Sequence, residues 1–124
     1  MIKVLIADDQ AILADGIKSV LSSDGELEVV GIAGNGEEAV RLTEELSPDV
    51  VLMDIRMPVM NGVISTQQIK RARPEVKVLV LTTFDDSDYI LGAINNGASG
   101  YLLKDTSASA LIDSIKNAYA GDTI

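Results

Sequence analysis

Three aspartates follow two short apolar runs, and their positions predict a cation site. Asp8 and Asp9 come directly after the run 2–7, and Asp54 follows the run 49–53. Ligands of open α/β sheets bind outside the carboxyl ends of the strands, where the strand order reverses. If the two runs are neighbouring parallel strands, the three carboxylates meet and repel one another, by on the order of 4 kcal/mol for each close pair. A divalent ion compensates such a cluster, and Mg²⁺ suits two or three carboxylates with waters.

Each acid has an ordinary alternative explanation when it is taken alone. Asp8 or Asp9 could cap the helix that follows, and Asp54 could simply end a strand. Two further residues at strand ends favour the cation site. Thr82 ends the run 77–82, and Lys104 follows the run 99–103.

Thr82 and Lys104 give the predicted site a second function. A hydroxyl and an ammonium group do not bind a bare metal ion, but they can donate to a phosphoryl group held beside one. A carboxylate can attack phosphorus and form an aspartyl phosphate. The chain has no histidine and no cysteine. We therefore expect a domain that accepts and holds a phosphoryl group, and not an enzyme that turns over a substrate.

The pattern of the whole chain predicts how these residues are positioned. β-Branched runs alternate with amphipathic stretches, as five βα units in a parallel sheet covered on both faces would require. The expected strands are 2–7, 28–33, 49–53, 77–82 and 99–103, and the expected helices are 11–22, 36–46, 63–72, 87–96 and 107–120.

Local signals support these helices. Asn35 and Glu38 resemble a capping box, and Asn96-Gly97 offers a stop for the fourth helix. Two sets of apolar residues have helical spacing and predict core-facing stripes. They are Ile12, Leu13, Ile17, Val20 and Leu21 in the first helix, and Leu111, Ile115, Ala118 and Tyr119 in the last.

Composition narrows the class of protein. The chain of 124 residues has a net charge of −9 and no cysteine. A module that binds duplex DNA should carry a basic face, whereas the densest basic stretch here is Lys70, Arg71 and Arg73, which suits a solvated helix end. No apolar run approaches the roughly 20 residues that span a bilayer, and no cleavable signal is recognisable, so we expect a cytoplasmic protein without membrane contact.

Taken together, the motifs resemble the receiver (CheY-like) domain of bacterial two-component response regulators. The matching positions are Asp8-Asp9, Asp54 with Met57-Pro58 and Asn61-Gly62, then Thr82, Tyr101 and Lys104. The segments 81–84 and 100–105 are most similar to receivers that precede a LuxR-type (NarL-type) helix-turn-helix domain. The resemblance implies a flavodoxin-like (βα)5 fold whose parallel strands follow the order 2-1-3-4-5.

The resemblance also implies a role for each matching residue. Asp54 would be the phosphoacceptor, and Thr82 and Lys104 would bind the phosphoryl oxygens. Mg²⁺ would be bound by the carboxylates of Asp9 and Asp54 and by the backbone carbonyl of Arg56, with Asp8 acting largely through water. Tyr101 would swing inward when Thr82 moves.

The sequence departs from the family pattern at three positions. Asp105 stands where many receivers have a proline after the lysine. Arg56 and Phe84 are large side chains at positions that, in the family, border the path of the hydrolytic water. We predict that these two side chains obstruct that path and make the phosphoryl group long-lived.

The implied partners are a sensor histidine kinase and, after phosphorylation, a second copy of the chain, bound through the first and fifth helices. Residues 1–120 would form the receiver, and 121–124 would begin a linker to a C-terminal DNA-binding domain that this chain does not contain. A stand-alone receiver that acts through protein contacts remains an alternative.

Two other functions fit the sequence less well. Phosphatases that form an aspartyl phosphate carry a second acid two residues after the nucleophile, where this chain has Arg56. A nucleotide- or flavin-binding module would need a glycine-rich loop after the first strand, where Asp8-Asp9-Gln10 stands.

Overall fold

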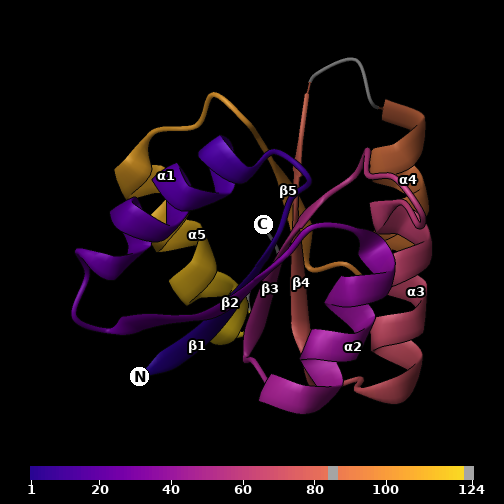
Figure 1. Cartoon of the computed structure of the whole chain (residues 1–124), viewed down its shortest axis with the longest axis horizontal. Coiled ribbons are helices and arrows are strands. Elements are labelled where there is room, and N and C mark those ends of the chain that lie inside the picture. Colours follow the sequence, from indigo (N-terminus) through magenta and orange to yellow (C-terminus); the bar gives the residue numbers. More distant parts are fainter. Residues whose placement is uncertain (84–86, 122–124) are drawn as a thin grey trace.

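A five-stranded parallel sheet lies between two layers of helices in the computed structural model, which describes residues 1–83 and 87–121 (Figure 1). The strand order is β2-β1-β3-β4-β5, as the resemblance implied. The strands are β1 (Ile2–Ala7), β2 (Leu27–Ala33), β3 (Val50–Asp54), β4 (Lys77–Thr82) and β5 (Gly100–Leu103). The helices are α1 (Ala11–Ser22), α2 (Gly36–Leu46), α3 (Gly62–Ala72), α4 (Ser87–Asn95) and α5 (Ala108–Tyr119).

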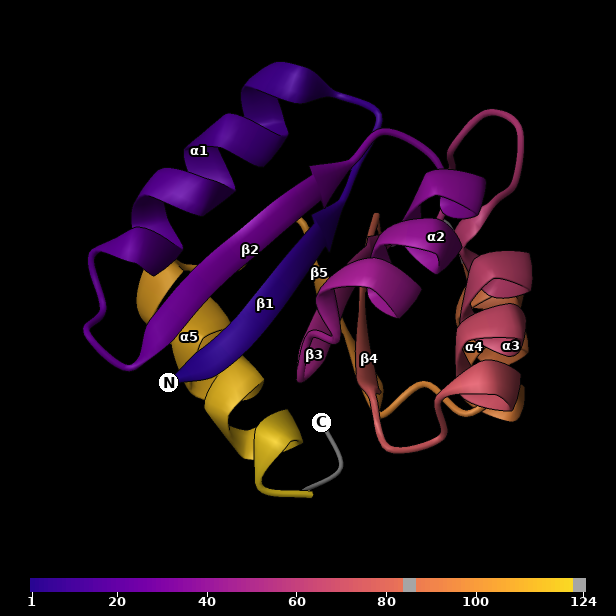
Figure 2. The ribbon, with the colours of Figure 1, turned by 60° about the horizontal axis from the view of Figure 1, so that its bottom comes forward.

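The helices are divided between the two faces of the sheet. Figures 1 and 2 show α1 and α5 together on one face, and α2, α3 and α4 on the other. The predicted elements are confirmed in number and order, and their ends differ from the predicted ones by at most one residue. Such an arrangement covers a parallel sheet on both sides, which explains why its strands are almost continuously apolar.

Two separate apolar cores fill the spaces between the sheet and the two helix layers. Along β1, Leu5 and Ala7 belong to the core under α2, α3 and α4, whereas Val4 and Ile6 belong to the core under α1 and α5. This alternation is the period of two that a strand imposes on its side chains. Every residue of β3 is buried. The strand that ends in Asp54 is therefore the most firmly enclosed part of the sheet.

The predicted capping box of α2 forms with one difference. The side chain of Asn35 accepts a hydrogen bond from the backbone N–H of Glu38 at 2.8 Å. The carboxylate of Glu38 accepts from the N–H of Gly34 at 3.0 Å, one residue before the expected partner. At the end of α4, Gly97 has a φ of +101°, the left-handed conformation that suits the predicted stop.

Two apolar residues that were expected on core-facing stripes lie in solvent. Ile12 is 90% exposed and Tyr119 is 50% exposed. The buried stripe of α1 contains Ala14 and Leu21, and Ile12 lies about 200° around the helix from Ala14, at about 100° per residue. The prediction that Ile12 faces the core was therefore wrong. Apolar residues at roughly helical spacing do not specify how the helix is rotated against the sheet.

Two further features bear on the predictions. All peptide bonds within the described residues are trans, so the Lys104–Asp105 bond is trans. Among residues 1–83 and 87–121, the structure contains no helix that is both long and apolar enough to cross a membrane.

Candidate functional site at the carboxyl edge of the sheet

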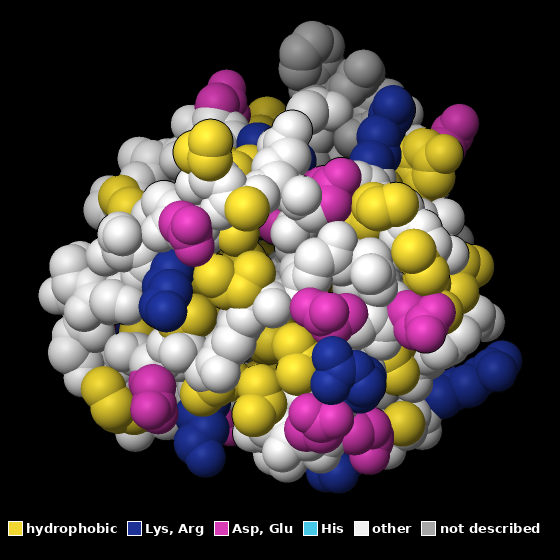
Figure 3. Space-filling model, in the orientation of Figure 1, with side chains coloured by type: hydrophobic (Ala, Val, Ile, Leu, Met, Phe, Trp, Pro, Cys, Tyr) yellow, Lys and Arg dark blue, Asp and Glu magenta, His cyan; other side chains and the backbone are white. Residues whose placement is uncertain are grey.

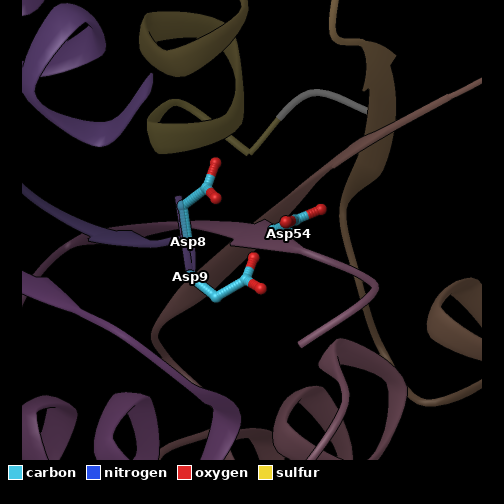
Figure 4. Close-up of side chains that lie close together, drawn as sticks. All are labelled: Asp8, Asp9 and Asp54. Carbon is cyan, nitrogen blue, oxygen red and sulfur yellow. The ribbon is translucent and has the colours of Figure 1, made fainter. Parts of the chain in front are cut away.

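The three predicted acids meet at the carboxyl edge of the sheet. β1 and β3 are parallel neighbours, and Ala7 pairs with Met53, so the residue after each of these partners lies at the same rim. Asp8, Asp9 and Asp54 each place a carboxylate oxygen within 4.8 Å of the others. Figure 4 shows the three side chains close together, with Asp8 and Asp9 after β1 and Asp54 at the end of β3. The geometric expectation from the sequence is confirmed.

Asp8 has one carboxylate oxygen with a partner and one without. Its Oδ1 accepts a hydrogen bond from the backbone N–H of Gln10 at 2.9 Å. Its Oδ2 is buried and has no hydrogen-bond partner among the described residues. The N-cap of α1 is Gln10, so neither Asp8 nor Asp9 is the capping residue. A buried carboxylate oxygen that lacks a donor, beside two more carboxylates, fits a cation site.

Lys104 forms an ion pair with Asp54. Its Nζ is 3.1 Å from Oδ1 of Asp54, and the Asp54 side chain is only 5% exposed. Burial raises the pKa of Asp54 to about 6; Lys104 opposes this rise and the negative charge of Asp8 adds to it. Asp54 is therefore a desolvated carboxyl group whose charged form depends on nearby positive charge.

Thr82 is held at the same rim by the ends of β4 and β5. Its side chain is buried, and its Oγ1 donates to the carbonyl oxygen of Thr83 at 3.1 Å. The backbone carbonyl of Thr82 accepts from the N–H of Lys104 at 2.9 Å. Tyr101, on β5, is 45% exposed. The structure thus brings together five predicted site residues at one rim: Asp8, Asp9, Asp54, Thr82 and Lys104. Tyr101 lies on the surface.

The segment after Asp54 is fixed by contacts that the sequence analysis missed. A Cβ atom at Gly62 would lie 2.3 Å from the backbone oxygen of Asp54, and one at Gly36 would lie 2.2 Å from that of Met60. The N–H of Gly36 donates to the Met60 carbonyl at 2.9 Å, and the hydroxyl of Ser65 donates to the Gly36 carbonyl at 2.8 Å. The Asn61-Gly62 pair was a visible signal for Gly62; nothing local marks Ser65.

A strained turn lies in the same segment. Val59 has a φ of +69°, and the N–H of Met60 donates to the carbonyl of Pro58 at 2.7 Å, which closes a γ-turn around Val59. Positive φ is unfavourable for a β-branched residue, and a γ-turn of this hand is rare and strained. Asn61 then begins α3 by accepting hydrogen bonds from the N–H groups of Val63 and Ile64.

The Arg56 side chain lies beside the first turn of α4. It is exposed, and its guanidinium carbon lies 5.6 Å from the centre of the Tyr89 ring, in the first turn of α4. Phe84, the other residue predicted to border the site, lies outside the described residues. The contact with Tyr89 joins segments 33 residues apart in the chain, so the sequence contained no local signal for it.

Surface charge agrees with the composition. On the face in Figure 3, Lys and Arg side chains lie singly or beside acidic ones, without a continuous basic area. Arg41, for example, pairs with Glu38 and Glu45 on α2, and Arg73 pairs with Glu44. Of the predicted basic stretch, Lys70 donates to the carbonyls of Pro74 and Val76, as a residue at a helix end would.

Comparison with known proteins gives one family. Residues 4–116 match the response regulator receiver domain family. The transcriptional regulatory protein LnrK of Bacillus subtilis (strain 168) is 50% identical over all of this chain, which corresponds to 56% of LnrK. The DegU protein of Brevibacillus brevis is 46% identical over 93% of this chain and 49% of its own length. The chain thus spans about half the length of the curated relatives it matches.

A solved structure agrees with the sequence match. A DNA-binding response regulator of the LuxR family from Staphylococcus aureus superimposes with a TM-score of 0.89 and 31% identity, over 96% of this chain and 99% of that one. The family match covers most of the described sheet and contains every predicted site residue. The chain therefore belongs to the response regulator receiver domain family, and its similar proteins include LuxR-family regulators.

Proposed function

We propose that this receiver domain accepts a phosphoryl group on Asp54 from a sensor histidine kinase and that Mg²⁺ is required for the transfer. One observation carries the proposal: the buried Asp54 carboxylate lies within ion-pair distance of Lys104 and within 4.8 Å of two more carboxylates. The unpartnered Oδ2 of Asp8 supports a cation at this position. Asp8, Asp9, Asp54 and the backbone carbonyl of Arg56 would hold the ion, which would neutralise charge on the transferring oxygens.

Residues of this chain would carry out the transfer beside the ion. An Asp54 oxygen forms a bond to phosphorus, and the bond between phosphorus and the kinase histidine nitrogen breaks, with its electron pair going to the nitrogen. Phosphoryl transfer depends chiefly on positioning and charge neutralisation, because little proton transfer is needed. Lys104 supplies a positive charge beside Asp54, and Thr82 supplies a hydroxyl at the same rim.

The output is a switch at Thr82 and Tyr101. A phosphoryl group adds about −1.5 to −2 charges at neutral pH. Its oxygens would attract the Thr82 hydroxyl, and Tyr101 would then move inward from its exposed position. The 45% exposure of Tyr101 supports this direction, because the ring has apolar area to bury.

Acetyl phosphate with Mg²⁺, followed by intact-mass measurement, tests the proposal. We expect one added phosphoryl group on the unaltered chain and none on Asp54→Asn. Asp49→Asn is the matched control, because Asp49 adjoins the other end of β3 and should leave the modification intact. Omission of Mg²⁺ or addition of a chelator should prevent it. Equal modification of Asp54→Asn would reject Asp54 as the acceptor.

The same proposal makes the chain a signalling domain of the cytoplasm and not an enzyme with a separate substrate. Beyond its own phosphorylation, it would catalyse only slow loss of its phosphoryl group. The phosphatase alternative lacks support, because the position two residues after Asp54 is Arg56, whose side chain contacts Tyr89.

The domain would control a LuxR-type DNA-binding domain that follows it in the chain. The relatives LnrK and DegU are transcriptional regulatory proteins about twice as long as this chain, which supports residues 121–124 as the start of a linker after a receiver at 1–120. The reading frame after Ile124 tests this. A helix-turn-helix sequence supports DNA binding, and an immediate stop codon supports the stand-alone receiver.

Phosphorylation would promote a homodimer through α1 and α5. Ile12 is 90% exposed on α1 and borders a groove of about 410 Å³ that continues between α1 and α5 as far as Lys104. An apolar side chain beside an apolar groove on the same face is suited to a self-complementary contact. Light scattering should detect a dimer of the phosphorylated chain, and Ile12→Glu should remain monomeric while still accepting the phosphoryl group.

A further inference from the structure

Three of the five asparagines in the chain are followed directly by glycine, in the pairs Asn35-Gly36, Asn61-Gly62 and Asn96-Gly97. Such a pair can react with itself. The glycine nitrogen, once it has lost its proton, attacks the side-chain carbonyl carbon of the asparagine, and the missing glycine side chain leaves the backbone free to bend toward it. The sequence therefore contains three equivalent candidates for spontaneous deamidation, whose surroundings in the fold are not equivalent.

The first two pairs lie at the starts of α2 and α3, and their glycines are buried. The N–H of Gly36 donates to the carbonyl of Met60 at 2.9 Å, and the N–H of Gly62 donates to the carbonyl of Ile55 at 2.7 Å. The two asparagine side chains are held as well, because each caps its helix by accepting backbone hydrogen bonds. Attack at either pair would need a buried N–H to lose its partner and a helix cap to open at the same time.

The third pair lies just after α4, where fewer contacts enclose it. Gly97 is exposed, and its N–H donates at 3.0 Å to the carbonyl of Ile94 in the last turn of α4. The Asn96 side chain is half-buried, and its Nδ2 donates at 2.7 Å to the carbonyl of Gly92, also in α4. Both bonds break when this turn frays, and fraying segments have the lowest opening free energies in a protein. At nine residues, α4 is also the shortest helix in the described part of the chain.

We propose that Asn96 is a site of spontaneous deamidation in the folded protein, whereas the fold protects Asn35 and Asn61. The Gly97 nitrogen loses its proton to hydroxide or a buffer base and forms a bond to Cγ of Asn96. The bond from Cγ to Nδ2 then breaks, and the side-chain nitrogen takes a proton from solvent and leaves as ammonia. Water opens the resulting succinimide ring at one of its two carbonyls, which gives aspartate or isoaspartate at position 96. The reaction needs neither Mg²⁺ nor a phosphoryl donor, so it is independent of the proposed function.

The product places a charge where the fold has a hydrogen-bond donor. Nδ2 of Asn96 donates to the Gly92 carbonyl, whereas a carboxylate in its place can only accept. Two acceptors would then face each other, and the new negative charge would lie at the carboxyl end of a helix, where the dipole disfavours it. Deamidation should therefore loosen the end of α4 irreversibly.

The experiment follows each asparagine separately. The chain is incubated in mildly alkaline buffer and digested with a protease, and mass spectrometry of the peptides detects deamidation as a gain of one dalton. An ordinary backbone hydrogen bond changes an opening constant by about three- to tenfold, and the buried pairs must open several, so Asn96 should react at least about ten times faster than Asn35 or Asn61. In guanidinium chloride the three rates should converge, because only the shared glycine then matters.

Two variants isolate the site. Asn96→Gln keeps an amide but would require a larger ring, so the fast reaction should disappear. Asn95→Gln is the matched control, because Asn95 is exposed beside Asn96 but is not followed by glycine. It should leave the fast reaction unchanged.

Three results would overturn the proposal. They are equal rates at the three asparagines of the folded chain, a fastest reaction at Asn35 or Asn61, and a folded chain that stays unmodified while the unfolded chain reacts completely. Asn96→Asp imitates one product and tests its effect on the fold. It should lower the midpoint of thermal unfolding more than Asn95→Asp does, and an unchanged midpoint would overturn the expected loosening of α4.

Discussion

Two aspartates lie at opposite ends of the buried strand β3, and their surroundings differ. Asp49, just before the strand, is hydrogen-bonded to its neighbours at the amino edge of the sheet. Its Oδ2 accepts from the N–H of Lys3 at 2.9 Å, its own N–H donates to the Lys3 carbonyl, and its carbonyl accepts from Lys77. Asp54, at the other end, is buried beside two further acids and has a raised pKa. Hydrogen bonds satisfy the aspartate at the amino edge, whereas the carboxyl edge keeps an electrostatic cost that Lys104 offsets only in part.

The difference shows how one residue type serves two purposes in a single strand. A carboxylate that accepts backbone hydrogen bonds stabilises the sheet. A carboxylate that is desolvated among like charges keeps an electrostatic cost until a cation binds beside it. The carboxyl edge also contains the strained turn at Val59 and the close approach of Gly62 to Asp54. Substitutions at the two edges should therefore change the stability of the fold differently.

Gly62→Ala should destabilise the carboxyl edge most. Its Cβ would lie 2.3 Å from the backbone oxygen of Asp54, which has no room to move because β3 is buried on both sides. We expect a loss of roughly 3 kcal/mol in the free energy of unfolding, measured with urea. Gly16→Ala is the matched control, because a Cβ there meets nothing within 4 Å. In the interior of α1 it should stabilise by about 0.5–1 kcal/mol. A harmless Gly62→Ala would contradict the described close approach.

Asp54→Asn should stabilise the metal-free protein at neutral pH. Burial raises the pKa of Asp54 from 3.8 to about 6, so the folded state favours the protonated form. The stability that this form provides is complete below pH 3.8 and is lost as the pH rises through about 6. Asparagine remains neutral throughout. The variant should therefore match the unaltered chain near pH 4 and exceed it by roughly 2–3 kcal/mol at pH 7.5.

Urea unfolding at several pH values without divalent ions measures this difference. Asp49→Asn, at the opposite edge, should show no such gain at pH 7.5, because it weakens the bond that the Lys3 N–H donates. A difference between Asp54→Asn and the unaltered chain that does not change from pH 4 to 7.5 would contradict a raised pKa.

Mg²⁺ should raise the stability of the unaltered chain and remove part of the cost at the carboxyl edge. At ten times its dissociation constant, an ion that binds only the folded state adds about 1.4 kcal/mol. Asp8→Asn should reduce this gain, since Oδ2 of Asp8 is the unpartnered atom. Thermal unfolding over a range of Mg²⁺ concentrations measures the effect, and Asp49→Asn should respond as the unaltered chain does. The same gain in all variants would mean that the ion binds elsewhere.

Val59→Gly should give the smallest change, a stabilisation of about 0.5–1 kcal/mol. Glycine relieves the positive φ of 69°, and its greater freedom in the unfolded chain offsets part of that gain. Ser47→Gly is the comparison at the other end of the sheet, because Ser47 has a φ of 48° at the end of α2. Ser47 is not β-branched, so its replacement should gain less. Urea unfolding would contradict the strain at Val59 if the order of the two gains were reversed.

The local sequence was sufficient to predict the order of strands and helices along the chain, because strand and helix periods are local and Pro48 and Pro74 lie just before strands. It also determined that the acids end strands, and hence which side chains could meet once the strand order was known. These properties need only neighbouring residues, which explains why the predicted elements agree closely with the observed ones.

The surroundings of those acids depend on the tertiary structure. Only the packed sheet leaves Oδ2 of Asp8 without a donor, raises the pKa of Asp54 and brings Tyr89 against Arg56. It also places Ile12 in solvent, because the sequence pattern does not specify how α1 is rotated about its axis against the sheet. Each of these outcomes depends on groups distant in the chain or on how an element is rotated. Burial and charge interactions act through space, and a pattern of neighbouring residues does not contain them.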